Sequence, residues 1–277
     1  MPHNPMNEIA AGLAAGRLAP YLGPDLLTLD GPAAVPDSAL ALAAAINGRI
    51  SVSGRIRNNL WATAQWIESF KHRITLVRLL EDLFAPVPAP TRLHGWLAGL
   101  GLPLIVDTWY DTMMADALRG KAAPFVEWQG IRRSGQTYEE PWGKCYDASG
   151  AEISGVSANG ATVLYKPHGA VRPAANFLIS DSDYVEVLTE IDIQTPIPET
   201  VIELRGNLGF AFLGCRFYDQ MQRTFAHQII KRSAGPHYAV LTGELTKNER
   251  RFLELEGITQ IDLPLSEAVD LLIGVGK

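Results

Sequence analysis

The stretch LPLIVDTWYD, residues 102–111, decides the fold class. It is a nearly continuous apolar run that ends in polar and aromatic residues, which is typical of a parallel strand buried on both faces. Five more strand-like segments alternate with helical patterns: LAPYLG (18–23), ATVLYKP (161–167), NLGFAFLG (207–214), HYAVLT (237–242) and ITQIDLP (258–264). Such alternation requires crossover connections, so the sequence predicts an α/β fold whose parallel sheet is covered by helices on both faces.

Two insertions interrupt this alternation. A helical pattern over about 35–100 separates the first two strands and predicts a helical insertion. Residues 121–160 have glycines and scattered charges without a clean period, and we expect either a hairpin-like excursion or a mobile, irregular surface insert there. With no repeat in the sequence, we expect residues 1–277 to form a single domain.

Composition excludes several classes of function. The 24 Lys and Arg against 30 Asp and Glu give a net charge of −6, so no global field attracts nucleic acid. No window reaches about 18 uninterrupted apolar residues, and we expect no membrane partner. The two cysteines, Cys145 and Cys215, cannot build a four-cysteine zinc site, and the histidines lack metal-ligand spacing. We expect a cytoplasmic protein without a bound metal.

Polar residues and glycines follow four of the predicted strands. They form the segments Gly23–Asp25, Asp107–Asp111, Lys166–Gly169 and Gly214–Arg216. Ligands of open parallel sheets bind outside the carboxyl ends of the strands, so these segments are the candidate site. His168 is the candidate proton acceptor, because it ends a buried strand and precedes a glycine that permits close approach.

An ordered set of motifs resembles the bacterial sirtuin-like domains, in particular their zinc-free branch. The motifs are LAPYLGPDLL (18–27), LIVDTWYDTMMADAL (104–118), YKPHGAV (165–171), ISDSDYVEVL (179–188) and FAFLGCRFYDQ (210–220). The resemblance implies a Rossmann-like core that binds NAD beside a helical insertion. In many zinc-free members it also implies cleavage of NAD to nicotinamide and ADP-ribose.

The resemblance assigns roles to individual residues. His168 takes the place of the general base, Asp111 supports the ribose site, and Trp109 occupies the position of an asparagine that orients a ribose hydroxyl or water. The implied ligand-binding residues are Gly23, Pro24, Asp25, Asp107, Thr108, Tyr110, Gly169, Gly214, Arg216 and Asp219.

Several positions depart from the family pattern. Pro24 and Asp25 replace a small residue and a glycine, and Asp25 adds a carboxylate where phosphates would lie. Trp109 has a single donor where an amide both donates and accepts. Arg216 replaces a small hydroxyl residue, and its partner is either a ligand phosphate or Asp219.

Two main interpretations stay open. The chain is an NAD hydrolase with His168 as its base, or it is a catalytically degenerate module. As a module it would bind a dinucleotide or an ADP-ribose-like ligand, a protein partner or a second copy of itself, without turnover. A third interpretation is another planar small molecule stacked on Trp109.

Overall fold

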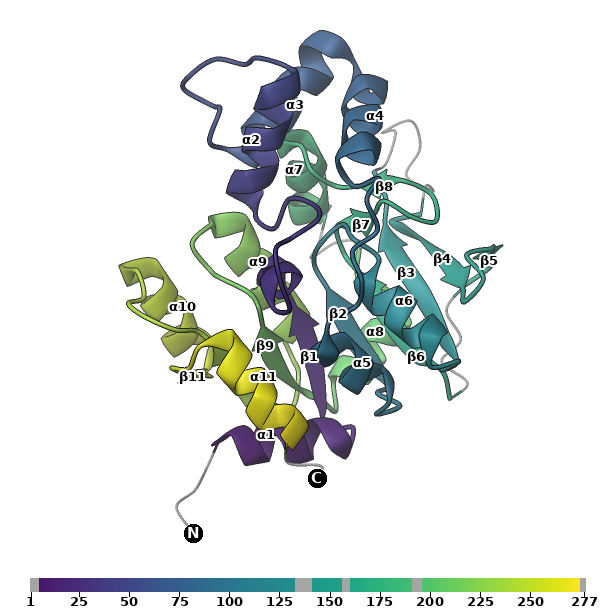
Figure 1. The fold of residues 1–277 in the computed structure, drawn as a ribbon, viewed down its shortest axis with the longest axis vertical. Helices are drawn as coiled ribbons and strands as arrows, with labels where there is room; N and C mark the ends of the chain where they lie inside the picture. The colour runs from purple at the N-terminus through teal and green to yellow at the C-terminus, as the bar shows by residue number, and fades with distance from the viewer. Residues whose placement is uncertain (1–4, 133–140, 156–159, 191–195, 275–277) are drawn as a thin grey trace.

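The computed structural model describes residues 5–132, 141–155, 160–190 and 196–274, and its centre is a nine-stranded sheet (Figure 1). The strand order is β11-β10-β9-β1-β2-β6-β3-β4-β5, in which β11 through β3 are parallel and β4 and β5 are antiparallel additions. A separate two-stranded ribbon pairs β7 with β8. The strands are β1 (Leu18–Leu22), β2 (Leu104–Asp107), β3 (Phe125–Gly130), β4 (Gly143–Asp147), β5 (Glu152–Ile153), β6 (Thr162–Lys166), β7 (Gly169–Ala170), β8 (Asn176–Phe177), β9 (Gly209–Leu213), β10 (His237–Val240) and β11 (Ile258–Ile261).

Helices cover both faces of the sheet. One buried cluster joins α1, α5, α6 and α11 to the first face, and another joins α8, α9 and α10 to the second. Side chains of β2 alternate between the clusters, with Ile105 in the first and Val106 in the second, as the period of a strand requires. The predicted α/β fold, a Rossmann-like parallel sheet covered on both faces, is confirmed. The helices are α1 (Pro5–Ala14), α2 (Ala39–Arg49), α3 (Leu60–Lys71), α4 (Arg73–Leu83), α5 (Arg92–Ala98), α6 (Met113–Gly120), α7 (Asp181–Glu190), α8 (Glu199–Arg205), α9 (Gln220–Ile230), α10 (Lys247–Glu256) and α11 (Leu265–Gly274).

Local sequence signals set several helix boundaries. Ser38 caps α2 by accepting a hydrogen bond from the amide of Ala41. Thr246 and Glu249 form a reciprocal capping box at the start of α10. Gly257 ends that helix in the left-handed conformation, with a φ of 64°. Within the described part of the chain, no helix combines the length and apolar character needed to cross a membrane.

Three helices, α2, α3 and α4, form a separate layer beyond the carboxyl ends of the strands (Figure 1). They share a buried cluster with Trp109 and Tyr110, which follow β2, and with Phe177 of β8. Helix α5 lies within the predicted insertion of about 35–100 but packs on the sheet with α6 and α11. The helices that pack away from the sheet therefore span residues 39–83.

The region expected to be irregular, about 121–160, differs from that expectation over its described residues. It supplies β3, β4 and β5, and β3 pairs in parallel with β6 along five residue pairs. The strands escaped notice because β3 has charged and polar residues at buried positions, among them Glu127 and Gln129. Residues 133–140 and 156–159 lie outside the described residues.

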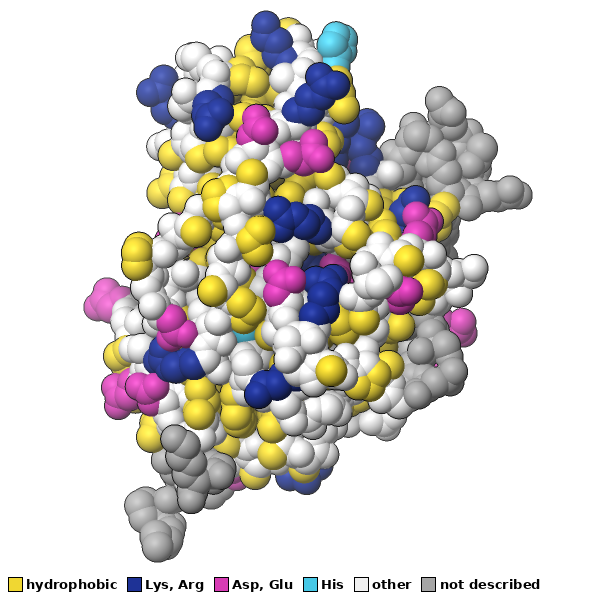
Figure 2. Space-filling view, turned by 45° about the vertical axis from the view of Figure 1, so that its right-hand side comes forward, with side chains coloured by type: hydrophobic (Ala, Val, Ile, Leu, Met, Phe, Trp, Pro, Cys, Tyr) yellow, Lys and Arg dark blue, Asp and Glu magenta, His cyan; other side chains and the backbone are white. Residues whose placement is uncertain are grey.

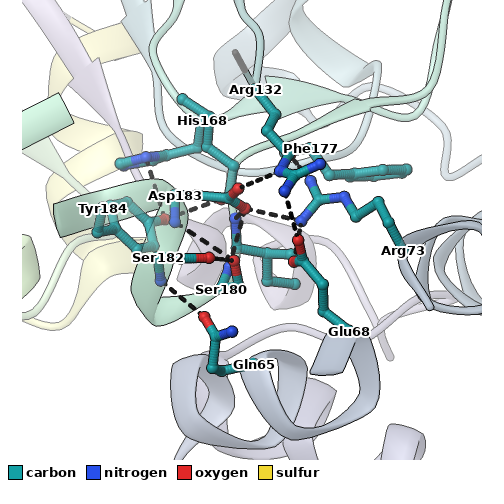
Figure 3. A network of polar contacts seen from close by, with 12 residues as sticks. Gln65, Glu68, Arg73, Arg132, His168, Phe177, Ser180, Ser182, Asp183 and Tyr184 are labelled. Carbon is teal, nitrogen blue, oxygen red and sulfur yellow. Dashed lines mark hydrogen bonds and ion pairs between the residues drawn. The ribbon is translucent and has the colours of Figure 1, made fainter. Parts of the chain in front are cut away.

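A buried carboxylate ties the helical layer to the rest of the fold (Figure 3). The side chain of Asp183, in the first turn of α7, is fully buried, and its Oδ2 accepts a hydrogen bond from Nη1 of Arg73 at 2.8 Å. The same oxygen accepts the amides of Ile179 and Ser180. Arg73 begins α4 and also contacts Glu68 of α3 at 2.9 Å. This network fixes α3 and α4 against α7.

We predict that Asp183→Asn lowers the free energy of unfolding by about 3 kcal/mol, because Arg73 and Arg132 both lose a buried carboxylate partner and only Glu68 remains to pair with them. Urea unfolding monitored by circular dichroism measures this change. The matched control is Glu152→Gln, which breaks the exposed Lys144–Glu152 pair, 2.8 Å long. It should cost less than about 1 kcal/mol, and equal losses in the two variants would contradict the anchoring role of Asp183.

Candidate functional site

The carboxyl ends of β1 and β9 meet at the centre of the sheet. After β1 the chain continues to one side of the sheet, and after β9 it continues to the other, so the topological switch point lies between them. Gly23 follows β1 and Gly214 follows β9. A Cβ atom on Gly23 would lie 2.3 Å from the carbonyl oxygen of Gly214, and Gly214 itself has a φ of +69°. The two turns therefore pack backbone against backbone, which only glycine permits here.

The backbone of the β1 turn is already hydrogen-bonded. The amide of Gly23 donates to the carbonyl of Leu213 at 3.0 Å, and the amide of Asp25 donates to the carbonyl of Gly214 at 3.1 Å. Between them, Pro24 has no N–H to offer. A phosphate held at such a turn is bound by free amides. The three residues expected to cradle a pyrophosphate thus have no amide left for it.

A narrow cleft with a cavity volume of about 50 Å³ lies beside these turns, between the sheet and the helical layer. This is below the roughly 300–1,000 Å³ typical of ligand pockets, so a ligand of that size needs the cleft to widen. Aromatic rings dominate its wall, and Arg216 is the one Lys, Arg, Asp or Glu among the described residues that line it. The lining residues are Tyr21, Pro24, Ala39, Leu60, Trp61, Thr108, Trp109, Tyr110, His168, Tyr184, Cys215, Arg216, Phe217 and Gln222.

The positively charged surface of the helical layer does not line the cleft. Figure 2 shows Lys and Arg side chains gathered at the end of the molecule formed by α2, α3 and α4. Arg55, Lys71 and Arg78 are exposed there, and none of them lines the cleft. Electrostatic attraction for an anionic ligand inside the cleft must therefore come from Arg216 alone among the described lining residues.

His168 lines the cleft, and Tyr184 lies beside its ring (Figure 3). Its Nδ1 is 3.3 Å from the hydroxyl of Tyr184, and its ring centroid is 4.5 Å from that of Phe225. The hydroxyl hydrogen of Tyr184 goes to the carbonyl of Leu178, which can only accept, so we assign the proton of the imidazole to Nδ1. Burial, assisted by the charge of Lys166, lowers the pKa of His168 to about 3. The imidazole is therefore neutral, with Nε2 as an acceptor.

The three residues after Asp107 use their polar atoms within the protein. The hydroxyl of Thr108 donates to the carbonyl of Leu22 at 2.8 Å. The indole N–H of Trp109 donates to the carbonyl of Pro36 at 2.8 Å, and the side chain is only 5% exposed. Tyr110 is buried, and its hydroxyl is bonded to a backbone carbonyl. Trp109 is thus part of the core beneath the helical layer as well as part of the cleft wall.

Arg216 pairs with Glu249, and the predicted alternative of a pair between Arg216 and Asp219 is therefore wrong. The guanidinium contacts both carboxylate oxygens of Glu249, at 3.1 and 3.2 Å, and donates to the carbonyl of Thr242 at 3.0 Å. Glu249 is held in place by the capping box of α10. Asp219 instead accepts the amide of Met221 and caps α9. The charge of Arg216 is therefore balanced by a carboxylate of the protein itself.

The carboxyl of Asp25 adds negative charge next to the cleft. Burial raises the pKa of Asp25 to about 6, Arg216 opposes this shift, and the nearby Asp37 adds to it. At pH 7.5 the group is still mostly ionised. The β1 turn is therefore a negative element of the site.

Two of the predicted residues lie beneath the cleft. Asp107 forms a buried ion pair with Lys166, with 2.5 Å between Oδ2 and Nζ. Asp111 is buried and accepts the amide of Met113 at the start of α6. Burial raises the pKa of Asp111 to about 6, with a further contribution from Asp107, and burial also raises the pKa of Glu127. Neither Asp107 nor Asp111 is among the lining residues.

Gly169 serves chain packing. It has a φ of +77°, and a Cβ there would lie 2.1 Å from the carbonyl oxygen of Asn176. The glycine therefore lets β8 approach β7. Elsewhere in the described residues, no three His, Cys, Asp or Glu side chains are grouped so that they could hold a metal ion.

The structure brings together some of the predicted residues and adds others. Tyr184 was quoted within a motif but not assigned to the site, and Trp61 comes from the helical insertion, whose docking no local pattern encodes. The predicted residues in the cleft wall are Pro24, Thr108, Trp109, Tyr110, His168 and Arg216. The predicted residues outside that wall are Gly23, Asp25, Asp107, Asp111, Gly169, Gly214 and Asp219.

Comparison with known proteins identifies the family to which the chain belongs. A family model described as a SIR2-like domain matches residues 103–261, more than half of the chain. The match begins just before β2 and ends with β11, so β1, its turn and the helices α2 to α4 precede it. No curated protein matches the chain.

We predict that Gly23→Ala destabilises the protein by about 1–3 kcal/mol, because the new methyl group forces the β1 and β9 turns apart. Thermal and urea unfolding measure the loss. Gly48→Ala in α2 is the control, since its Cβ would meet no atom within 4 Å. It should be neutral or stabilising, by up to about 1 kcal/mol. An unchanged Gly23→Ala protein would refute the close contact.

We predict that His168 destabilises the fold in acid. Its pKa is lower in the folded state, so below about pH 6.5 the unfolded chain binds the proton first and stability falls as the pH drops toward 3. Between pH 7 and pH 5 this loss is about 2 kcal/mol. In His168→Asn, which keeps a donor for Tyr184 but does not titrate, the unfolding free energy should fall by that much less over the same interval. Identical pH dependence in both proteins would contradict a neutral His168.

Proposed function

Because the chain belongs to the SIR2-like domain family, we propose that it binds a ligand of the NAD class in the cleft and does not hydrolyse it. The NAD class here means NAD, ADP-ribose or a nucleoside part of either. The aromatic wall of the cleft and its position at the switch point support this proposal.

The observation that carries the proposal is the position of Trp109. Cleavage of a glycosidic bond needs a group that positions the ribose and the attacking water. The asparagine that the family resemblance places here could donate and accept, whereas the indole has a single donor. That donor is committed to the carbonyl of Pro36, and the ring is packed against Phe84 and Tyr110. Trp109 therefore supports a bound ligand but not a bound nucleophile.

The environment of His168 supports the same proposal. A general base works best with a pKa near the working pH. Burial lowers the pKa of His168 to about 3, which makes the imidazole a weak base, although Nε2 remains a good acceptor of a hydrogen bond. The residue is thus suited to hold a ribose hydroxyl rather than to take its proton.

Hydrolysis of NAD is the second candidate. It is favoured by one observation, the presence of His168 and Thr108 in the wall of the same cleft. In that case His168 would accept a proton from water or from a ribose hydroxyl when the ligand rearranges its surroundings.

We predict binding without turnover. Isothermal titration calorimetry of the full chain with NAD, ADP-ribose, adenosine and nicotinamide riboside should detect at least one ligand. His168→Ala should lower the affinity for that ligand about tenfold, which is the effect of losing one hydrogen bond. Chromatography after incubation with NAD should show no nicotinamide release above that of His168→Ala. Release that depends on His168 would establish the hydrolase, and absence of binding by all four compounds would refute the ligand class.

A further inference from the structure

The β1 turn and the residues around it oppose phosphate. The carboxyl of Asp25 lies close enough to act on the charge of Arg216 and on the thiol of Cys215, both of which line the cleft. A second carboxyl, Asp37, acts on Asp25 from the segment before α2. Asp25 directly follows Pro24 of the cleft wall, so its carboxyl adds negative charge beside the cleft without lining it.

The one guanidinium that could offset them is already occupied. Arg216 contacts both oxygens of Glu249, whose pKa is lowered by hydrogen bonds from Thr246, Arg216 and the amide of Phe217 despite its burial. The guanidinium of Arg216 also lies over the ring of Tyr218, with 4.5 Å between the guanidinium carbon and the ring centroid. Recruiting Arg216 to a phosphate would leave Glu249 buried and unpaired. Arg216 thus already balances the carboxylate of Glu249, and its charge also acts on Asp25.

The backbone of the β1 turn cannot compensate. In family members that bind a pyrophosphate, the resemblance places the phosphates at a glycine turn, where free amides would donate. Here the amides of Gly23 and Asp25 are bonded to β9 carbonyls. Freeing them would require the β1 and β9 turns to separate, although Gly23 and Gly214 are packed in direct contact. The turn is closed by the same contact that joins two central strands.

What the cleft does offer suits a ring and a sugar. Trp61 and Tyr184 both line the cleft and pack edge to face, with ring centroids 6.2 Å apart and an interplanar angle of 70°, so the wall contains aromatic rings against which a planar group could pack. Nε2 of His168 can accept a hydrogen bond from a hydroxyl or an N–H group. Gln222, at the start of α9, adds an amide that can donate and accept.

From these observations we infer that the ligand of the cleft is a phosphate-free nucleoside, a planar base with its ribose, rather than a pyrophosphate-bearing dinucleotide. The inference rests on the proposed function and narrows it. The base packs against the aromatic wall, a ribose hydroxyl donates to His168, and the β1 turn excludes a 5′-phosphate by the charge of Asp25 and the lack of free amides.

Matched pairs of ligands test the inference. The full chain is titrated calorimetrically at pH 7.5 with adenosine and AMP, and with nicotinamide riboside and nicotinamide mononucleotide. At least one nucleoside should bind, at least tenfold more tightly than its own 5′-monophosphate. A monophosphate that binds as tightly as its nucleoside, or more tightly, overturns the inference and leaves the proposed function standing. Absence of binding by these four compounds as well as by NAD and ADP-ribose overturns both.

Two variants locate the effect. Asp25→Asn removes the charge without changing the size of the side chain. The affinity for the monophosphate should therefore rise about tenfold, while the affinity for the nucleoside should change by less than about twofold. Asp30→Asn is the control, because that exposed carboxylate pairs with Arg92 on the surface, and it should change neither ligand. Melting temperatures confirm that both variants are folded. A preference for the nucleoside that is unchanged in Asp25→Asn would contradict the role given to Asp25.

Discussion

At the centre of the sheet, the turns after β1 and β9 come so close that neither can carry a side chain at the contact. Gly23 and Gly214 occupy this point, and amides of the β1 turn donate to carbonyls of β9 and its turn. The contact joins the two strands at which the sheet changes direction, so it fixes the floor of the cleft. It also consumes the backbone groups that an open glycine turn offers to phosphate. One steric constraint thus shapes both the fold and the chemistry of the site.

Much of the fold follows from short-range signals. The parallel strands β1, β2, β6 and β9 lie within largely apolar runs that could be recognised, because strands buried on both faces need apolar residues at successive positions. The capping box of Thr246 with Glu249 and the left-handed Gly257 marked α10 for a similar reason, since local hydrogen bonds and φ decide them. Strand β3 escaped recognition because Glu127 and Gln129 are buried there in a polar network, which breaks the apolar pattern.

The candidate site could be predicted in its location but not in its contacts. The carboxyl ends of parallel strands meet at one edge, so His168 and Thr108 could be expected to converge. Partners distant in the sequence could not be anticipated: Arg216 meets Glu249, which is 33 residues away, and the indole of Trp109 meets Pro36, which is 73 residues away. Both contacts depend on how α10 and the helical layer dock, and docking is decided by side-chain packing rather than by any local period.

The charges around His168 make it a weak base. A histidine that acts as a base gains strength from a carboxylate bonded to its second nitrogen. In this protein Nδ1 of His168 faces the neutral hydroxyl of Tyr184, and the charge that acts on the ring is the cation Lys166, two residues earlier. The nearby carboxylate of Asp107 is paired with Lys166 instead. The weak base that follows β6 and the indole that follows β2 thus arise from separate causes, and both favour the proposed binding of a ligand without its cleavage.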